Sequence, residues 1–348
     1  MTILNQMWAA RKMFRTQRKL PQDLAVVDFD ADAVRCVRLK LSAGEVVIVA
    51  ADILPAVDIS DAAQVKAFKL PKNMASRYIA VCIPGYDAIV KLLNLPGALD
   101  SQVEEKIREH MGVEGGSYRF GYRIVSQTHS ETRLLTVAIP ESQVQAACAI
   151  FPSGLPVPVT VELGGLAVMS AFLHGPGNTV QDEAIGVIEF GSRVTYFAFF
   201  KKRELILIRK FDFGHFSLLD QIEKSMGVDR QTARDIVVDR SFDISQLVKD
   251  LTDPFIKQLV ISKHFVERRE NCHISKIFVP DDQRVLRDWL NEIKVAMGLD
   301  VSTWHPFDGV KLLPDALPQQ FEKCRSQFAA AMGAGLAMSE EGLVGPGA

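Results

Sequence analysis

The feature that most constrains the fold of this chain is a short hairpin pattern that occurs twice. One apolar strand ends in an acid, a Phe and a turn residue at Asp28–Asp30, and another ends in the same way at Glu189–Gly191. Each is followed by a second β-rich strand. The two acids lie 161 positions apart (189 minus 28), a period too long for a solenoid. The repeat therefore predicts two lobes of similar topology, although two unrelated hairpins would give a comparable pattern.

Strands and helices alternate along the rest of the chain, which is typical of α/β layers. We expect strands over Leu24–Asp28, Val34–Leu41, Glu45–Ile53, Tyr78–Ile83, Arg119–Thr128, Arg133–Ile139, Val159–Leu163, Ala184–Phe190, Val194–Phe200, Glu204–Phe211 and Lys276–Val279. We expect helices over Ser101–Met111, Glu141–Ile150, Gly165–Leu173, Leu218–Met226, Asp229–Val238, Leu247–Glu270, Asp282–Met297 and Phe328–Met338. The Gly/Pro-rich run His174–Gly177 is the best linker candidate. His215, next to Gly214, is expected to cap a turn.

Bulk composition narrows the class of protein. A chain of 348 residues is too long for one simple core, and a net charge of -2 gives no global attraction for nucleic acid. The five cysteines form no CxxC pair, so neither a disulfide framework nor a zinc site is indicated. No apolar run is long enough for a membrane helix. We therefore expect a cytoplasmic protein without a resident metal that does not bind nucleic acid.

The two ends of the chain differ from its body. Residues 1–21 form a basic arm with five Lys or Arg and no acid. Leu4, Met7 and Trp8 recur there at helical spacing. The arm is therefore either a docking arm or frayed terminus, or a short amphipathic helix that touches an anionic membrane surface. The Gly-rich segment 339–348 is expected to be a disordered tail.

In nucleotide-binding folds of this layout, two such turns face each other across a cleft. Each needs glycine so that backbone N–H groups can approach a phosphate, hydroxyls that donate to it, and an acid that holds hydrated Mg²⁺. The second turn has Gly191, Ser192 and Thr195. The first has Asp30 at the glycine position and Asp32 nearby, and two carboxylates there would repel phosphate unless a cation intervened.

At these hairpins the chain resembles the PilM family of type IV pilus assembly, which is similar to the cell-division protein FtsA. The family's first turn, Asp-x-Gly-Ser-Ser-Ser-x-Lys, becomes Asp28–Arg35 and loses its glycine and serines, and its second, Asp-Ile-Gly-x-x-x-Thr, becomes Glu189–Thr195. Further matches follow in order at Lys91–Pro96 (a run that leads into a helix), Phe120–Tyr122, Gly154–Leu155, Val161–Glu162, Gly214–Leu218, Gly227–Ala233 and Ala331–Ala337. Where the family has a Gly-Gly turn for adenosine, this chain has Pro280–Asp282.

The resemblance implies an α/β fold of two actin-like lobes, the duplicated RNase H-like fold of the ASKHA proteins, with an inserted subdomain of the FtsA/PilM type. It places the first lobe at residues 22–178, with the inserted subdomain at about 86–152. The second lobe then covers residues 179–338, and its last helix, 326–338, is expected to return to the first lobe.

The resemblance also implies a function. PilM-like proteins bind the short cytoplasmic N-terminal tail of the membrane protein PilN in a cleft of the first lobe, and so couple the inner-membrane platform of the pilus to its motor ATPase. We predict such a scaffold, peripheral at the cytoplasmic face of the inner membrane, with homo-oligomers left open. The segment around Tyr78–Pro96 is the candidate groove, unless these residues are simply core.

The alternative prediction is an active ATPase or kinase of the same fold. It requires a Mg-ATP site formed by Asp28, Glu189, Gly191, Ser192 and Thr195. Because the first turn and the adenosine turn have lost their glycines, this alternative ranks below the scaffold, and the expected nucleotide site is degenerate.

Overall fold

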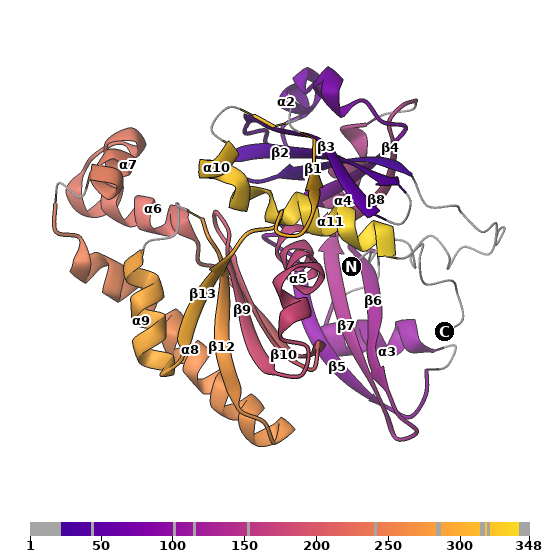
Figure 1. Ribbon diagram of the computed structural model, residues 1–348, viewed down its shortest axis with the longest axis vertical. Helices are drawn as coiled ribbons and strands as arrows, with labels where there is room; N and C mark the ends of the chain where they lie inside the picture. The colour runs from indigo at the N-terminus through magenta and orange to yellow at the C-terminus, as the bar shows by residue number, and fades with distance from the viewer. Residues whose placement is uncertain are drawn as a thin grey trace.

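The computed structural model describes residues 22–42, 45–99, 102–113, 116–151, 154–239, 242–282, 287–313, 317–318 and 321–340. The predicted basic arm, and the predicted tail beyond residue 340, lie outside the described residues. Figure 1 shows two lobes, each with its own large sheet, and two helices, α5 and α11, between them. A third, smaller sheet lies beside α5.

The first lobe is built on a sheet whose strands run in the order β14-β3-β2-β1-β4-β8. Its members are β1 (Asp23–Phe29), β2 (Ala33–Ser42), β3 (Glu45–Pro55), β4 (Tyr78–Ile83), β8 (Val157–Leu163) and β14 (Lys311–Leu312). The first three strands form an antiparallel meander, and β4 and β8 continue the sheet in parallel with β1. Leu24–Asp28 is buried along its whole length, as expected for a central strand covered on both faces.

The second lobe repeats this topology. Its sheet runs in the order β11-β10-β9-β12-β13, formed by β9 (Ala184–Phe190), β10 (Thr195–Lys201), β11 (Glu204–Phe211), β12 (Ile274–Pro280) and β13 (Asp300–Trp304). Again three antiparallel strands are followed by two parallel ones. The predicted two-lobed fold with a duplicated hairpin is therefore confirmed, although β13 was not among the expected strands.

Between β4 and β8 the chain forms the smaller sheet, in the order β5-β7-β6. Its strands are β5 (Ile89–Pro96), β6 (Tyr118–Gln127) and β7 (Glu131–Pro140), accompanied by α3 (Val103–Met111) and α4 (Glu141–Ala149). The run at Lys91–Pro96 is part of strand β5, since it pairs along its whole length with β7, and helix α3 follows it as expected. The boundaries predicted from the sequence for the two lobes and the inserted subdomain stay predictions.

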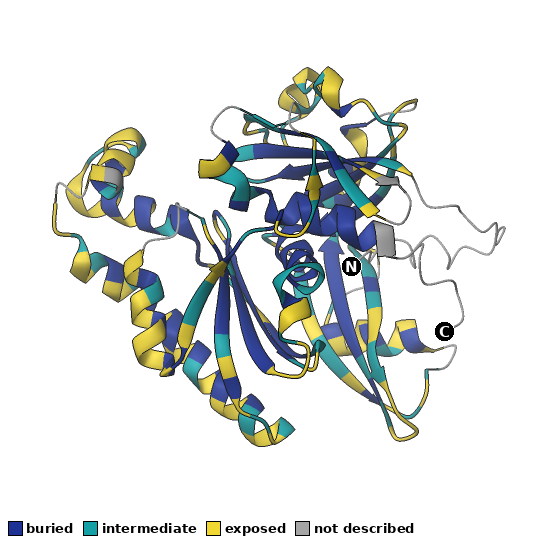
Figure 2. Ribbon diagram, viewed as in Figure 1, coloured by how far each residue is buried: buried dark blue, intermediate teal, exposed yellow. Residues whose placement is uncertain are grey.

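The remaining helices flank the sheets. They are α2 (Ala62–Ala67), η1 (Lys72–Met74), α5 (Gly164–His174), η2 (Pro176–Thr179), α6 (His215–Met226), α7 (Arg230–Asp239), α8 (Ser245–Glu270), α9 (Arg287–Met297), α10 (Phe321–Cys324), η4 (Arg325–Phe328) and α11 (Ala329–Glu340). In Figure 2 the outer helices of the second lobe are buried on one side and exposed on the other, whereas α5 and α11 are buried almost throughout.

Helix α5 lies at the centre of the molecule and contacts both lobes. Residues Gly164–Phe172 are all buried. A Cβ atom at Gly165 would lie 2.0 Å from the ring of Tyr196 on β10, so only glycine allows this approach to the second lobe. On its other side α5 packs against α11, which also lies on β1. The chain thus returns from the second lobe to the first before α11, because β14 already pairs with β3 of the first-lobe sheet.

Candidate functional site

The two repeated hairpin turns have the same backbone hydrogen bond. The N–H of Asp30 donates to the carbonyl of Ala33 at 3.1 Å, and the N–H of Gly191 donates to the carbonyl of Val194 at 3.0 Å. Both pairs are separated by the 161-residue offset found in the sequence. The turns are therefore structural equivalents that differ in side chains. In each of them the N–H of the residue after the Phe is already used within the turn.

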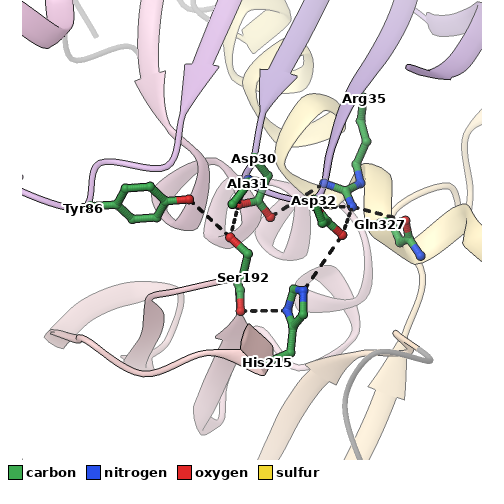
Figure 3. Close-up of polar contacts among 9 residues, drawn as sticks. Asp30, Ala31, Asp32, Arg35, Tyr86, Ser192, His215 and Gln327 are labelled. Atoms are coloured by element: carbon green, nitrogen blue, oxygen red, sulfur yellow. Dashed lines mark hydrogen bonds and ion pairs between the residues drawn. The ribbon is translucent and has the colours of Figure 1, made fainter. Parts of the chain in front are cut away.

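The first turn is held by a buried arginine. Arg35, on β2, is only 1% exposed, and its Nη2 donates to both carboxylate oxygens of Asp32, at 2.9 and 2.8 Å. Its Nη1 lies 3.7 Å from Asp30 Oδ2. Its Nη2 also donates to Oε1 of Gln327, on η4, at 3.2 Å. Arg35 therefore supplies the cation between the two carboxylates that the sequence placed at the phosphate position (Figure 3).

Ser192 joins the second turn to the first lobe. Its buried Oγ donates a hydrogen bond to Oδ1 of Asp30 and lies 3.3 Å from the hydroxyl of Tyr86. Burial, and next the carboxylate of Asp30, raise the pKa of the Tyr86 phenol, so it stays protonated in the physiological range. The serine that should donate to a phosphate donates instead to an aspartate of the opposite turn.

His215, the first residue of α6, binds the second turn and lies close to the first. Its backbone N–H and its ring Nδ1 both lie within hydrogen-bond distance of the carbonyl of Gly191, at 3.1 and 3.0 Å. Because a carbonyl only accepts, Nδ1 carries the proton and donates. The ring Nε2 then faces Asp32 Oδ2 at 3.9 Å. His215 thus fixes the start of α6 on the second turn and places its ring beside the first turn.

The structure brings together four of the five predicted site residues. Asp28 and Glu189, the equivalent acids at the ends of β1 and β9, line one small cavity between the lobes. The glycine and serine of the second turn make the contacts described above. Thr195 lies elsewhere: it is fully buried, and its Oγ1 donates to the carbonyl of Phe213 at 2.7 Å. Its hydroxyl therefore joins the start of β10 to the loop between β11 and α6, and Thr195 does not line the cavity.

The cavity between the lobes is small and acidic. Its volume is about 40 Å³, against roughly 300–1,000 Å³ for a typical small-molecule site. Its lining includes the carboxyl-bearing residues Asp28, Asp30, Glu189 and Asp282, with Arg35 as the cation. Asp282 belongs to the Pro280–Asp282 segment, where the resemblance to the PilM family implied a Gly-Gly turn. The cavity is thus smaller than a typical small-molecule site, and more carboxylates than cations line it.

Reasoning from the sequence missed part of this constellation. Arg35 was visible as the basic last position of the first motif, but its ion pairs were not. Tyr86 and Gln327 gave no signal, because they lie 106 residues from Ser192 and 292 residues from Arg35 respectively. Only the fold brings these side chains together.

Two larger hollows lie away from the hairpins. The first, here called the α2–α4 groove, has a volume of about 490 Å³ and is lined by Ile59, Ser60, Ala62, Val65, Lys66, Phe68, Ala146, Ala149 and Ile150. The second, of about 220 Å³, lies where α5, α11, β6, β7 and the β10–β11 hairpin meet. Within the described residues, no helix is both long and apolar enough to cross a membrane.

Comparison with known protein families gives one match that spans most of the chain. The model of the type IV pilus assembly protein PilM matches residues 26–341. The chain belongs to the PilM family. This membership, together with the two-lobed architecture, confirms the resemblance drawn from the hairpins. No curated protein sequence matches the chain at a significant level.

Solved structures support the same fold. A PilM-PilN type IV pilus biogenesis complex contains a chain with a TM-score of 0.75 and 15% identity, covering 91% of this chain and 98% of that one. A Bacteroides thetaiotaomicron protein with an actin-like ATPase fold and unknown function has a TM-score of 0.50 and 11% identity, covering 93% and 99%. At these identities the likeness shows the fold: this PilM-family chain has the actin-like architecture.

Proposed function

We propose that this protein is a scaffold of a type IV pilus-like assembly machine that binds the cytoplasmic N-terminal tail of a PilN-like inner-membrane protein. The observation that carries the proposal is the PilM-family match over residues 26–341. The similar chain in a PilM-PilN complex supports the class of partner. The scaffold works at the cytoplasmic face of the inner membrane, between the membrane platform and the motor ATPase. Binding a peptide tail as a scaffold requires a recognition groove but no catalysed reaction.

The α2–α4 groove is the place we assign to the tail. It lies wholly within the first lobe, between helix α2 and helix α4 of the smaller-sheet region, and it is the largest of the three hollows. Half-buried Val65 and Phe68 line it, with the buried Ile150. Phe68 makes edge-on contacts with Phe29 at 5.4 Å and Phe151 at 6.2 Å between ring centroids. These contacts give the groove a rigid apolar wall anchored on β1.

The rim of the groove leaves room for the side chains of a bound peptide. Ala62 on α2 and Ala149 on α4 are both small and exposed, on opposite sides of the groove. Lys66 is exposed beside them and offers a charge to an acidic or carbonyl group of the tail. An apolar hollow with few polar groups at its edge is the usual form of a site for one or two anchoring side chains of a peptide.

The segment Tyr78–Pro96 is less suited to this role. Strand β4 is paired on both sides, with β1 and with β8, so no further strand can be added there, and Ile79–Ile83 is buried core. Strand β5 packs against β11 of the second lobe. Just before β5, Lys210 donates to the carbonyl oxygen of Tyr86. None of the three hollows is lined by this segment.

The test is binding of a fluorescently labelled peptide that carries the cytoplasmic tail of the PilN-like protein of the same pilus system. Fluorescence polarisation should give saturable binding to the full chain. The variants Ala62→Arg and Ala149→Arg should weaken it at least tenfold, because each places a long charged side chain in the groove. Ala63→Arg, on the same helix but outside the groove lining, is the matched control and should bind as the wild type does.

The outcomes separate two questions. If no tail of the pilus membrane proteins binds, the scaffold proposal fails. If a tail binds but the two groove variants bind it as well as the control does, the partner stands and the location in the α2–α4 groove is wrong.

A further inference from the structure

In a two-lobed fold of this kind, a ligand that contacts both turns also holds the lobes together. Here the turns contact each other directly. Ser192 donates to Asp30, and His215 of the second lobe lies 3.9 Å from Asp32 of the first. Tyr86 adds a hydroxyl contact from the first lobe to Ser192 at 3.3 Å. The position between the turns is thus filled by side chains of the chain itself (Figure 3).

The charges in this contact are balanced inside the protein. A buried guanidinium needs anionic partners, because leaving a buried charge unpaired is costly. Arg35 has Asp32 in a short two-oxygen contact and Asp30 at 3.7 Å. The two carboxylates therefore lie where a phosphate would otherwise meet the basic residue at the end of the first motif. Because Arg35 already has two anions, it offers little attraction to a third.

We propose that this internal network, formed by Asp30, Asp32, Arg35, Ser192 and His215, replaces a nucleotide in holding the two lobes together. The lobes of this chain stay closed without ATP, and Mg-ATP does not bind between them. The groove for the PilN-like tail is then available whatever the nucleotide concentration. The network does not depend on the identity of that partner, so each proposal can fail without the other.

The first part of the test measures local opening by hydrogen–deuterium exchange of the intact protein. Asp30→Ala and Ser192→Ala each remove one side of the same contact. Each should speed exchange of amides in 28–35 and 189–195 by about tenfold, the effect of losing one charge-assisted hydrogen bond of about 1.4 kcal/mol. The double variant should add little to the larger single effect, because both substitutions break one interaction.

The matched control is Arg193→Gln. Arg193 is the next residue in the same turn, but its guanidinium is half exposed and pairs outward with Asp220 at 3.7 Å. Its loss should leave exchange in both turns within about twofold of the wild type, because exposed pairs contribute little. Gly191→Asp is a poor control, since a Cβ there would lie 2.8 Å from the carbonyl of Val194 and would distort the turn by itself.

The second part is thermal unfolding with millimolar Mg-ATP or Mg-ADP. We expect no shift of the wild-type melting temperature, since a ligand that binds only the folded state would raise it. A clear rise with either nucleotide overturns the proposal. So do additive effects of Asp30→Ala and Ser192→Ala, or exchange in the two turns that neither substitution changes, because each result means that the contact does not hold the lobes.

Discussion

The crossing of α11 and α5 gives the sharpest test of how the lobes are joined. Gly333 lies at that crossing. A Cβ atom built there would be 1.7 Å from the carbonyl oxygen of Ala167 and 2.9 Å from the backbone nitrogen of Ala171. These are backbone atoms of α5 and cannot rotate away. For Gly333→Ala the two helices must therefore separate by about 1.7 Å to reach ordinary contact near 3.4 Å.

The expected cost of that separation is large. Extra atoms in a well-packed core usually cost about 1–3 kcal/mol, and relief by side-chain rotation is not available here. Residues 329–338 of α11 are all buried, so a shift of the helix disturbs packing along its whole length. We expect Gly333→Ala to lower the free energy of unfolding by about 3 kcal/mol. That corresponds to a fall of roughly 6–12 °C in melting temperature, at about 2–4 °C per kcal/mol for larger domains.

Gly335→Ala is the matched control, two residues further along the same helix. Its Cβ would lie 2.0 Å from Leu39 Cδ2, the far end of a flexible side chain. Leu39 can change rotamer, so we expect a loss of about 1 kcal/mol. Both variants are compared by urea unfolding monitored by circular dichroism. If Gly333→Ala costs no more than Gly335→Ala, the backbone contact between α5 and α11 is not as close as described.

Three further substitutions test other contacts of the described chain. Although burial opposes it, the bidentate hydrogen bond from Arg38, at 2.8 and 2.6 Å, lowers the pKa of Asp23. The stabilisation from the ionised carboxylate is therefore complete above the ordinary pKa of about 4 and is lost as the pH falls through the lowered pKa of the folded state. Asp23→Asn should destabilise by about 1 kcal/mol at pH 7, and by progressively less as the pH falls below about 4, measured by urea unfolding. Gly165→Ala should lower the melting temperature by several degrees, because the ring of Tyr196 lies 2.0 Å from the new Cβ, and adding Tyr196→Leu should recover part of the loss in a double-mutant cycle. Arg133→Met removes ion pairs at 3.2 and 3.3 Å to two glutamates of the second lobe, and should speed hydrogen exchange at β11 without changing that of α3.

The duplicated fold was predictable because its signal is local and repeated. Acid, Phe and turn residue recur in the same order at Asp28–Asp30 and Glu189–Gly191, and the alternation of apolar residues around them is strong. Strands β5 and β13 were not predicted, because the local sequence signal for them is weak. β5 carries Lys91 and Asn94 among apolar residues and ends at Pro96, so its pattern is weak, and only its pairing with β7 makes it a strand.

The site was predictable only in part. The loss of glycine and serines from the first turn, and the charge conflict with phosphate, follow from the sequence. The sequence does not show how that conflict is resolved, because it does not distinguish a buried arginine from an exposed one. Thr195 is a second example: its position in the motif suggested the cleft, but its hydroxyl donates to the backbone carbonyl of Phe213.

Asp32 and Arg35 form one ion pair, and we treat the pair as a single change to the nucleotide motif. Alone, the acid would repel a phosphate. Without Asp32 the guanidinium, which is 1% exposed, would be a buried charge whose carboxylate partner is Asp30 at 3.7 Å. Arg35→Met should therefore cost about 3 kcal/mol or more, because it leaves two carboxylates without their cation. Arg35→Met combined with Asp32→Leu should cost less than Arg35→Met alone, since an ion pair replaced by apolar side chains is often neutral. Urea unfolding of both variants measures the difference. If the double variant is the less stable of the two, Arg35 and Asp32 contribute independently, and the exchange of a nucleotide site for an internal ion pair is the wrong account of the first turn.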